Sequence, residues 1–251
     1  MNDWIIPDWP APENVKALFT TRNGGVSRGI NGVYASLNLG AHVNDDLTDV
    51  KHNRAVLGDY LPQAPKWLKQ VHGTSSVWIE HATASPESDA ALSRRQESVC
   101  VVMVADCLPI FLCDTAGTTV GVVHAGWRGL AGGIIEQSVA EMRMGDMELM
   151  AWLGPAIGPH HFEVGEEVFE AFVSHSEQAR QAFIPKSRDV GHEKKWLADI
   201  FTLARQRLNA MGINKVYGGD ICTFSDPARF FSYRRDGETG RMAALIWLEK
   251  S

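Results

Sequence analysis

The sequence predicts an α+β protein in which mixed β-sheets are layered with helices. Short runs rich in Val, Ile and Leu, each bounded by turn residues, recur along the chain and are typical of buried strands. Several of these runs follow one another with no helical pattern between them, whereas amphipathic helical patterns separate other runs. This mixture favours an α+β arrangement over a doubly wound nucleotide-binding sheet.

The first half of the chain supplies most of the expected strands. Strands are predicted over the apolar runs at 15–20, 67–71, 77–80, 99–104, 108–113 and 119–123. One helix is expected to begin after Asn44 or Asp45, either of which can cap it, and to run through Leu57 with Gly58 just past its end. The small and polar residues of 82–97 predict a loop.

The second half alternates helices with strands. Helices are predicted over 130–144, 166–183 and 196–211, because apolar residues recur there on one face. Strands are predicted over 149–153, 216–217, 230–233 and 242–249. The chain has no internal repeat and no clear boundary between two cores, so residues 1–251 are interpreted as a single domain.

Composition limits the classes of function. The 251 residues are 45% hydrophobic and 22% charged, as in an ordinary soluble globular protein. The net charge of −6 and the lack of a basic block argue against a nucleic-acid binder or a membrane-surface binder. No apolar run approaches the ~20 residues that span a bilayer, and the start of the chain lacks a signal-peptide pattern. We therefore expect a cytoplasmic protein with reduced cysteines.

Three potential metal ligands, His72, Cys107 and His124, each follow an apolar strand-like run. If these strands are neighbours in one sheet, their ends bring Cys107 and His124 together at its rim. One cysteine and two histidines suit zinc, and three protein ligands leave a fourth position for water or substrate, as in catalytic zinc sites. The residues alone leave two alternatives: two satisfied histidines with a buried thiol, or a site involving the adjacent pair His160 and His161.

Several arginines lie in glycine-bearing loops rather than on helix faces. They are Arg22, Arg128, Arg234 and Arg235. A guanidinium in such a loop suits the recognition of phosphate or carboxylate, and the alternative for each is a structural ion pair with one of the 30 acidic residues. Asp106, which precedes the candidate cysteine ligand, either acts as a general acid/base or caps a turn.

Distinctive segments extend from near the N-terminus to near the C-terminus. They are FTTRNGGVS (19–27), SLNLGAHVND (36–45), KQVHG (69–73), ADCLPI (105–110), VGVVHAGWRGL (120–130), GPAIGPHHFEVG (154–165), DICT (220–223) and FSYRRDGETGR (231–241). Together, and in this order, they resemble the laccase-domain (multicopper polyphenol oxidase-like) family. The resemblance implies a four-layer α-β-β-α sandwich. One departure is that many members have a cysteine near His160 or His161, where this chain has none.

The resemblance implies a zinc ion held by His72, Cys107 and His124, with Cu²⁺ as the alternative metal. It also implies phosphorolysis of the purine nucleosides adenosine, inosine, guanosine and S-methyl-5'-thioadenosine, together with deamination of adenosine. Copper-dependent phenol oxidation and editing of peptidoglycan precursors are the other activities linked to the family. A four-copper oxidase needs histidines in pairs, and the nine histidines of this chain include no His-x-His motif.

Individual residues receive roles on this hypothesis. The metal acts as a Lewis acid, and Asp106 transfers a proton during deamination. Arg235 and Arg128 bind the phosphate, while Asn38 and Arg22 orient the ribose or the base. The expected partners are purine nucleosides and phosphate, and we expect a monomer or a weak homo-oligomer.

Overall fold

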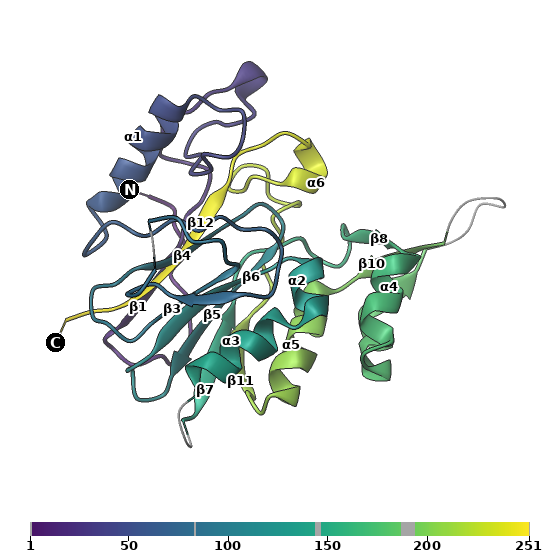
Figure 1. The fold of residues 1–251 in the computed structure, drawn as a ribbon. Coiled ribbons are helices and arrows are strands. Elements are labelled where there is room, and N and C mark those ends of the chain that lie inside the picture. The colour runs from purple at the N-terminus through teal and green to yellow at the C-terminus, as the bar shows by residue number, and fades with distance from the viewer. Residues whose placement is uncertain (1, 83, 144–146, 187–193, 251) are drawn as a thin grey trace.

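Two β-sheets that pack face to face form the centre of the molecule in the computed structural model (Figure 1). The structure describes residues 2–82, 84–143, 147–186 and 194–250. The first sheet is antiparallel and contains, in order, β1 (Val15–Phe19), β12 (Met242–Leu248) and β4 (Cys100–Val104). The second sheet is mixed and contains, in order, β11 (Lys215–Gly218), β7 (Leu149–Leu153), β5 (Leu108–Asp114), β6 (Val120–Ala125), β3 (Ala90–Ser93) and β2 (Ser76–Trp78).

The main core lies between the two sheets. Alternate residues of each strand point into this space, because side-chain direction alternates along a strand. The first sheet contributes buried residues such as Phe19 and Val102, and the second contributes Phe111 and Val122. The rings of Phe111 and Trp152 pack edge to face with their centroids 5.5 Å apart, so neighbouring strands of the second sheet are joined by aromatic packing as well as by hydrogen bonds.

Helices cover the two outer faces of this pair of sheets. α1 (Leu47–Gly58) lies on the first sheet, where Leu57 packs with Val101 and Leu245. α2 (Trp127–Gly132), α3 (Ile134–Met142) and α5 (Ile200–Ala210) lie on the far side, over the second sheet (Figure 1). The layers therefore run helix, sheet, sheet, helix, which agrees with the α+β fold and the four-layer sandwich that we expected.

A smaller antiparallel sheet lies to one side of the two-sheet core (Figure 1). It contains, in order, β8 (Glu163–Gly165), β10 (Lys195–Ala198) and β9 (Phe183–Pro185), and α4 (Glu166–Val173) follows β8 directly. The remaining helices are the short η1 (Ile30–Gly32), η2 (Glu177–Ala182) and α6 (Tyr233–Asp236). None of the helices in the described part of the chain is long and apolar enough to cross a lipid bilayer.

The predicted helices differ from the observed ones where a turn interrupts the apolar pattern. The helix expected over 130–144 is divided into α2 and α3 at Gly133, whose φ of +100° suits glycine and ends a helix; residue 144 lies outside the described residues. The helix expected over 166–183 ends at Val173. The helix expected over 196–211 begins only at Ile200, because the Asp199 carboxylate caps it there, and the residues before the cap form β10.

Three local predictions about strands are wrong. The segment 82–97, expected as a loop, contains the fully buried strand β3, whose small alanines carry no β-propensity signal. The segment 67–71 forms only an isolated bridge between Lys69 and Glu87. Residues 230–233 form no strand, and α6 begins at Tyr233.

We predict that Phe111→Ala lowers the free energy of unfolding by about 3–5 kcal/mol, because the substitution leaves a cavity between the two sheets. Urea denaturation measures this loss. Ile184→Ala is the control, since Ile184 is 63% exposed and its truncation costs at most about 0.5 kcal/mol. A loss below about 1 kcal/mol for Phe111→Ala would contradict the inter-sheet core.

Candidate metal centre

Three side chains with metal-binding atoms converge at the rim of the six-stranded sheet. The ligand atoms of His72, Cys107 and His124 all lie within 4.8 Å of one another. Cys107 directly precedes β5 and His124 lies near the end of β6, and the antiparallel pairing of Leu108 with Ala125 brings these ends together. His72 comes from the loop that precedes β2. The strand ends therefore meet as the sequence predicted for Cys107 and His124.

The buried carboxylate of Asp89 connects two of these three side chains. Its Oδ1 accepts a hydrogen bond from Nδ1 of His124 at 2.8 Å, which leaves Nε2 of that ring free for a metal. The same carboxylate accepts the backbone N–H groups of Val71, His72 and Gly73 at 3.2, 3.0 and 2.7 Å. One side chain thus orients the His124 ring and fixes the loop that carries His72.

The close approach of the ligands also depends on a glycine. A Cβ atom on Gly126 would stand 2.9 Å from Cδ2 of His72, closer than real Cβ atoms come to a neighbour, and a tight 3.0 Å from Sγ of Cys107. His72 itself has a φ of +59°, a conformation that residues other than glycine adopt infrequently. The hydrogen bonds to Asp89 are what stabilise this conformation.

Asp106 anchors the turn that presents Cys107. Its φ is +83°, and its buried carboxylate accepts hydrogen bonds from Oγ1 of Thr223 at 2.6 Å, Oγ of Ser232 at 3.0 Å and the backbone N–H of Arg234 at 2.7 Å. Both carboxylate oxygens are therefore used to join this turn to two loops near the C-terminus. Of the two roles that the sequence left open for Asp106, this geometry matches the structural one.

Charge interactions shift the pKa values of the ligands in the metal-free protein. Burial raises the pKa of the Cys107 thiol, but His124 and His72 outweigh it and lower the pKa to about 6. Burial lowers the pKa of His124, but the Cys107 thiolate and the Asp89 carboxylate outweigh it and raise the pKa to about 9. At neutral pH the site therefore holds a thiolate next to an imidazolium, and the thiolate is the form that binds metals.

The geometry of the three ligands fits a zinc ion. Tetrahedral zinc with bonds of about 2.3 Å to sulfur and about 2.0–2.1 Å to nitrogen places the two atoms about 3.6 Å apart. The observed distance between Sγ of Cys107 and Nε2 of His72 is 3.8 Å. His124 is buried, Cys107 half-buried and His72 exposed, so the group opens to the surface on one side. A thiolate and two imidazoles also suit copper, so the donor set leaves the identity of the metal open.

Two cavities meet at the metal-ligand candidates. The His42 cavity, of about 420 Å³, is lined by His42, Gln70, Met103, Arg241 and all three ligand candidates. The Trp127 cavity, of about 230 Å³, is lined by Trp127, Ile157, Phe162, Ile200, Arg128 and Arg234. His72, Cys107 and Tyr233 line both cavities. A ligand in either cavity therefore lies next to the candidate metal centre.

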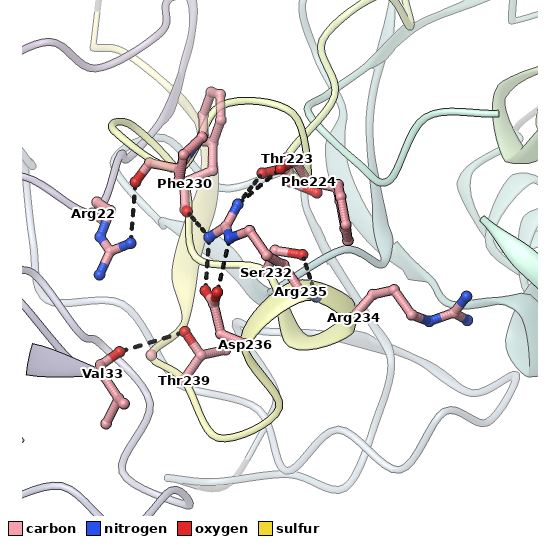
Figure 2. Close-up of polar contacts among 12 residues, drawn as sticks. Arg22, Val33, Thr223, Phe224, Phe230, Ser232, Arg234, Arg235, Asp236 and Thr239 are labelled. Atoms are coloured by element: carbon pink, nitrogen blue, oxygen red, sulfur yellow. Dashed lines mark hydrogen bonds and ion pairs between the residues drawn. The ribbon is translucent and has the colours of Figure 1, made fainter. Parts of the chain in front are cut away.

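Arg235, expected to bind phosphate, has no donor left for it. A guanidinium has five N–H donors, and those of Arg235 bond to the carbonyl oxygens of Thr223, Phe224 and Phe230 and to the carboxylate of Asp236. Figure 2 shows its guanidinium enclosed by these four residues, while the side chain of Arg234 extends away from it. Arg235 therefore ties together the C-terminal loops and does not face either cavity.

Asn38 and Arg22, expected to orient ribose or base, instead form hydrogen bonds with backbone groups. The buried amide of Asn38 donates to Gly40 and Asp45 and accepts the N–H groups of Gly40 and Arg241. Arg22 donates to two carbonyl oxygens and stacks over a phenylalanine ring. Neither residue lines the cavities at the metal centre. Arg128, by contrast, is exposed at the Trp127 cavity.

The rival histidine pair lies elsewhere. His160 and His161 line a separate cavity of about 320 Å³ together with Cys222, and the described residues contain one candidate metal group, which does not include them. The His161 ring stacks on Phe224. The Cys222 sulfur accepts hydrogen bonds from the backbone N–H of Gly158 and from a serine hydroxyl.

Three residues of the site were not anticipated from the sequence. Asp89 lies in the segment predicted as a loop, whose polar composition gave no sign of a buried carboxylate. His42 is exposed, and nothing in its polar sequence surroundings predicts that it lines a cavity beside the metal ligands. Arg241 was not among the arginines expected to bind phosphate. The available signal was that His42 and Arg241 both lie within segments that resemble the family.

Known proteins match nearly the whole chain. A family model described as "Multi-copper polyphenol oxidoreductase laccase" matches residues 16–249. The Pseudomonas aeruginosa protein named purine nucleoside phosphorylase PA4543 is 49% identical over 249 residues, which cover 99% of this chain and 100% of that protein. The Escherichia coli protein named purine nucleoside phosphorylase YfiH is 48% identical over 251 residues, which cover 99% of this chain and 100% of that protein.

Solved structures share the fold over nearly the whole length. Neisseria meningitidis protein NMB0706 matches with a TM-score of 0.91 at 47% identity, covering 99% of this chain and 100% of that one. YlmD from Geobacillus stearothermophilus matches with a TM-score of 0.80 at 32% identity, covering 98% and 96%.

We predict that Asp89→Asn weakens Zn²⁺ binding about 10–100-fold, because an outer-shell partner of a histidine ligand is lost and an amide cannot accept all of the N–H groups that now point at the carboxylate. A chelator competition assay measures the affinity. Asp114→Asn is the matched control: Asp114 is also buried and also accepts backbone N–H groups, but at the opposite end of β5. Equal losses in both variants would contradict a specific role for Asp89.

We predict that Zn²⁺ binding releases about one proton at pH 7.5, because His124 with a pKa of about 9 is charged in the metal-free protein and must bind as the neutral ring. Cys107, with a pKa of about 6, is already a thiolate at that pH. The affinity therefore rises about tenfold per pH unit from pH 6 to 9 and levels off above pH 9. Calorimetry in buffers of different ionisation enthalpy counts the protons, and a count of zero at pH 7.5 would contradict the assignment.

Proposed function

The chain belongs to the multi-copper polyphenol oxidoreductase laccase family, and we propose that within it the protein is a zinc-dependent purine nucleoside phosphorylase. The observation that carries the proposal is the His72–Cys107–His124 group, which opens into two joined cavities. Relatives that match nearly the whole chain at 48% and 49% identity are named purine nucleoside phosphorylases, which supports the reaction class. The three side chains would hold the ion.

The proposed substrates are inorganic phosphate and the purine nucleosides adenosine, inosine, guanosine and S-methyl-5'-thioadenosine. The aromatic and aliphatic walls of the Trp127 cavity suit a purine ring. Arg128, which stacks on Trp127 with its guanidinium carbon 4.4 Å from the ring centroid, is proposed as a contact of the substrate there. The geometry lends no such support to Arg22, Asn38 or Arg235, so we assign them no contact with substrate.

When bound, zinc supplies Lewis acidity next to the substrate. The chain's own residues do the positioning: Asp89 holds the His124 ring, and the turn at Asp106 holds Cys107. Tyr233, which is 61% exposed and lines both cavities, offers a ring face to the ribose or the base. Phosphorolysis needs an anion subsite and a base subsite, and the presence of two cavities that share lining residues at one centre supports the proposal.

Deamination of adenosine is a second proposed activity of the same centre. It needs a group that moves a proton beside the reacting carbon. Asp106 is the one carboxylate among the described residues that line the two cavities, and this observation favours it for that role. The Asp106 carboxylate already accepts three hydrogen bonds within the protein. It would therefore transfer a proton only if substrate replaces one of these donors.

Copper-dependent phenol oxidation receives less support. Within the described ranges, one group of histidine, cysteine and carboxylate side chains is arranged for a metal, whereas a four-copper oxidase needs a blue-copper ligand set and a cluster fed by further histidines. Elemental analysis of the protein therefore decides whether the centre holds zinc or Cu²⁺. A cytoplasmic location and a monomeric or weakly homo-oligomeric state stay predictions of the sequence.

We predict that His124→Ala and Cys107→Ser each lower phosphorolysis of adenosine at least ~100-fold, because each removes one of only three ligands. Chromatography of adenosine, inosine and guanosine with and without phosphate measures the products, and elemental analysis measures bound zinc. Cys222→Ser is the matched control, since Cys222 lies in a separate cavity.

Each result of this assay has a distinct meaning. Release of free base only when phosphate is present supports the phosphorylase, and conversion of adenosine to inosine without phosphate supports the deaminase. Stoichiometric copper with oxygen uptake, or no turnover of any free nucleoside, would contradict the proposal; the second result would favour a role on peptidoglycan precursors.

A further inference from the structure

Arg241 is a cation at the metal centre that makes no ion pair with a carboxylate of the described residues. Its guanidinium is half-buried and lines the His42 cavity. Nη1 donates to the carbonyl oxygens of Thr239 and Gly240 at 2.8 and 3.0 Å, while Nε and Nη2 have no hydrogen-bond acceptor among the described residues. No carboxylate in the described part of the chain lies within ion-pair distance of it. Three N–H donors are therefore left for a ligand.

The fold holds this guanidinium firmly in place. The backbone N–H of Arg241 donates to Oδ1 of Asn38 at 2.9 Å, and its carbonyl oxygen accepts the N–H of Leu39 at 3.0 Å. A Cβ atom on Gly40 would stand 2.8 Å from Cγ of Arg241, so the glycine makes room for the side chain. Burial lowers the pKa of Arg241 against the opposing effects of Cys107 and Asp106. A charge that is desolvated and immobilised, and that keeps unused N–H donors, indicates that an anion completes the site.

The other arginines near the centre lack this combination. All five donors of Arg235 are used by the chain itself. Arg234 donates to the carbonyl oxygen of Glu163, and both it and Arg128 are exposed at the Trp127 cavity, whose other walls are largely apolar. The His42 cavity, in contrast, combines Arg241 with the imidazole of His42 and the amide-bearing Gln70.

We propose that Arg241 is the phosphate-binding residue of the protein, so that phosphate occupies the His42 cavity and the purine occupies the Trp127 cavity. This inference rests on the proposed phosphorylase function. The ribose then lies between the phosphate and the purine, against Tyr233, Cys107 and His72, which line both cavities. Nε and Nη2 of Arg241 form the planar fork that binds two oxygens of one phosphate.

This placement matches the course of the reaction. A phosphate oxygen forms a bond to C1′ of the ribose on one face, while the bond from C1′ to the purine nitrogen breaks on the other. The electron pair of the broken bond goes to the base, and the proton lost by hydrogen phosphate ends on that base. A displacement of this kind needs nucleophile and leaving group on opposite faces of the sugar, and two cavities that share His72, Cys107 and Tyr233 offer a separate place for each.

The test is the zinc-loaded protein with Arg241→Met and Arg241→Lys. We expect Arg241→Met to raise the KM for phosphate at least ~10-fold, because a charge-assisted bidentate contact is lost. The KM for inosine should change less than ~3-fold. Arg241→Lys keeps the charge but loses the fork, so its KM for phosphate lies between those of the wild type and Arg241→Met. Arg95→Met, an exposed arginine beyond the far end of β3, controls for loss of charge.

A binding measurement without nucleoside separates this inference from the proposed function. Titration of inorganic phosphate into each zinc-loaded variant is followed by calorimetry. If the wild type binds phosphate and Arg241→Met binds it at least ~10-fold more weakly, the subsite holds even when no nucleoside is turned over. If phosphorolysis occurs but Arg241→Met leaves the KM and the affinity for phosphate unchanged, or if Arg128→Met raises the KM for phosphate instead, the inference is overturned while the proposed function stands.

Discussion

The carboxylate of Asp89 is the contact on which the rest of the site depends. It is fully buried, and it accepts four hydrogen bonds, one from the His124 ring and three from the successive N–H groups of residues 71–73. A buried carboxylate is costly unless it is saturated with donors, so this one tolerates little displacement of either partner. Two ligand candidates that are far apart in the chain are thereby held in one geometry.

The four-layer architecture explains why such a site lies at the rim of a sheet. The long strands β5 and β6 are buried on both faces and pair in an antiparallel register that ends near Cys107 and His124. Beyond these ends the chain leaves the sheet in loops, and loops from residues 36–45, 69–73 and 231–241 surround the opening. A rigid sheet that carries some of the site residues, surrounded by loops that carry the others, is a common arrangement of a binding site.

The arginines illustrate how far chemistry can be inferred from residue type. Arg235 and Arg241 both lie in the segment 231–241, six residues apart. The chain folds around Arg235 and satisfies all of its donors with carbonyl oxygens and Asp236, whereas Arg241 keeps three donors and faces the cavity (Figure 2 shows the first of these arrangements). Nothing in the local sequence distinguishes the two cases, because the carbonyl groups involved belong to residues 223, 224 and 230 of another loop.

Local pattern was enough to identify the α+β class and most of the strands, because apolar alternation and strand ends depend on neighbouring residues. It made His72, Cys107 and His124 candidates for a metal site, and the resemblance to the family selected them over the alternatives. The tertiary structure alone decided that Asp89 is the common anchor, that Asn38, Arg22 and Arg235 bond to the main chain, and that His42 and Arg241 face the centre. The reason is physical: a polar side chain can contact a substrate only if its donors and acceptors are not already bonded to backbone groups that are distant in the sequence. Which of these hydrogen bonds form is decided only by how the loops pack in the folded chain.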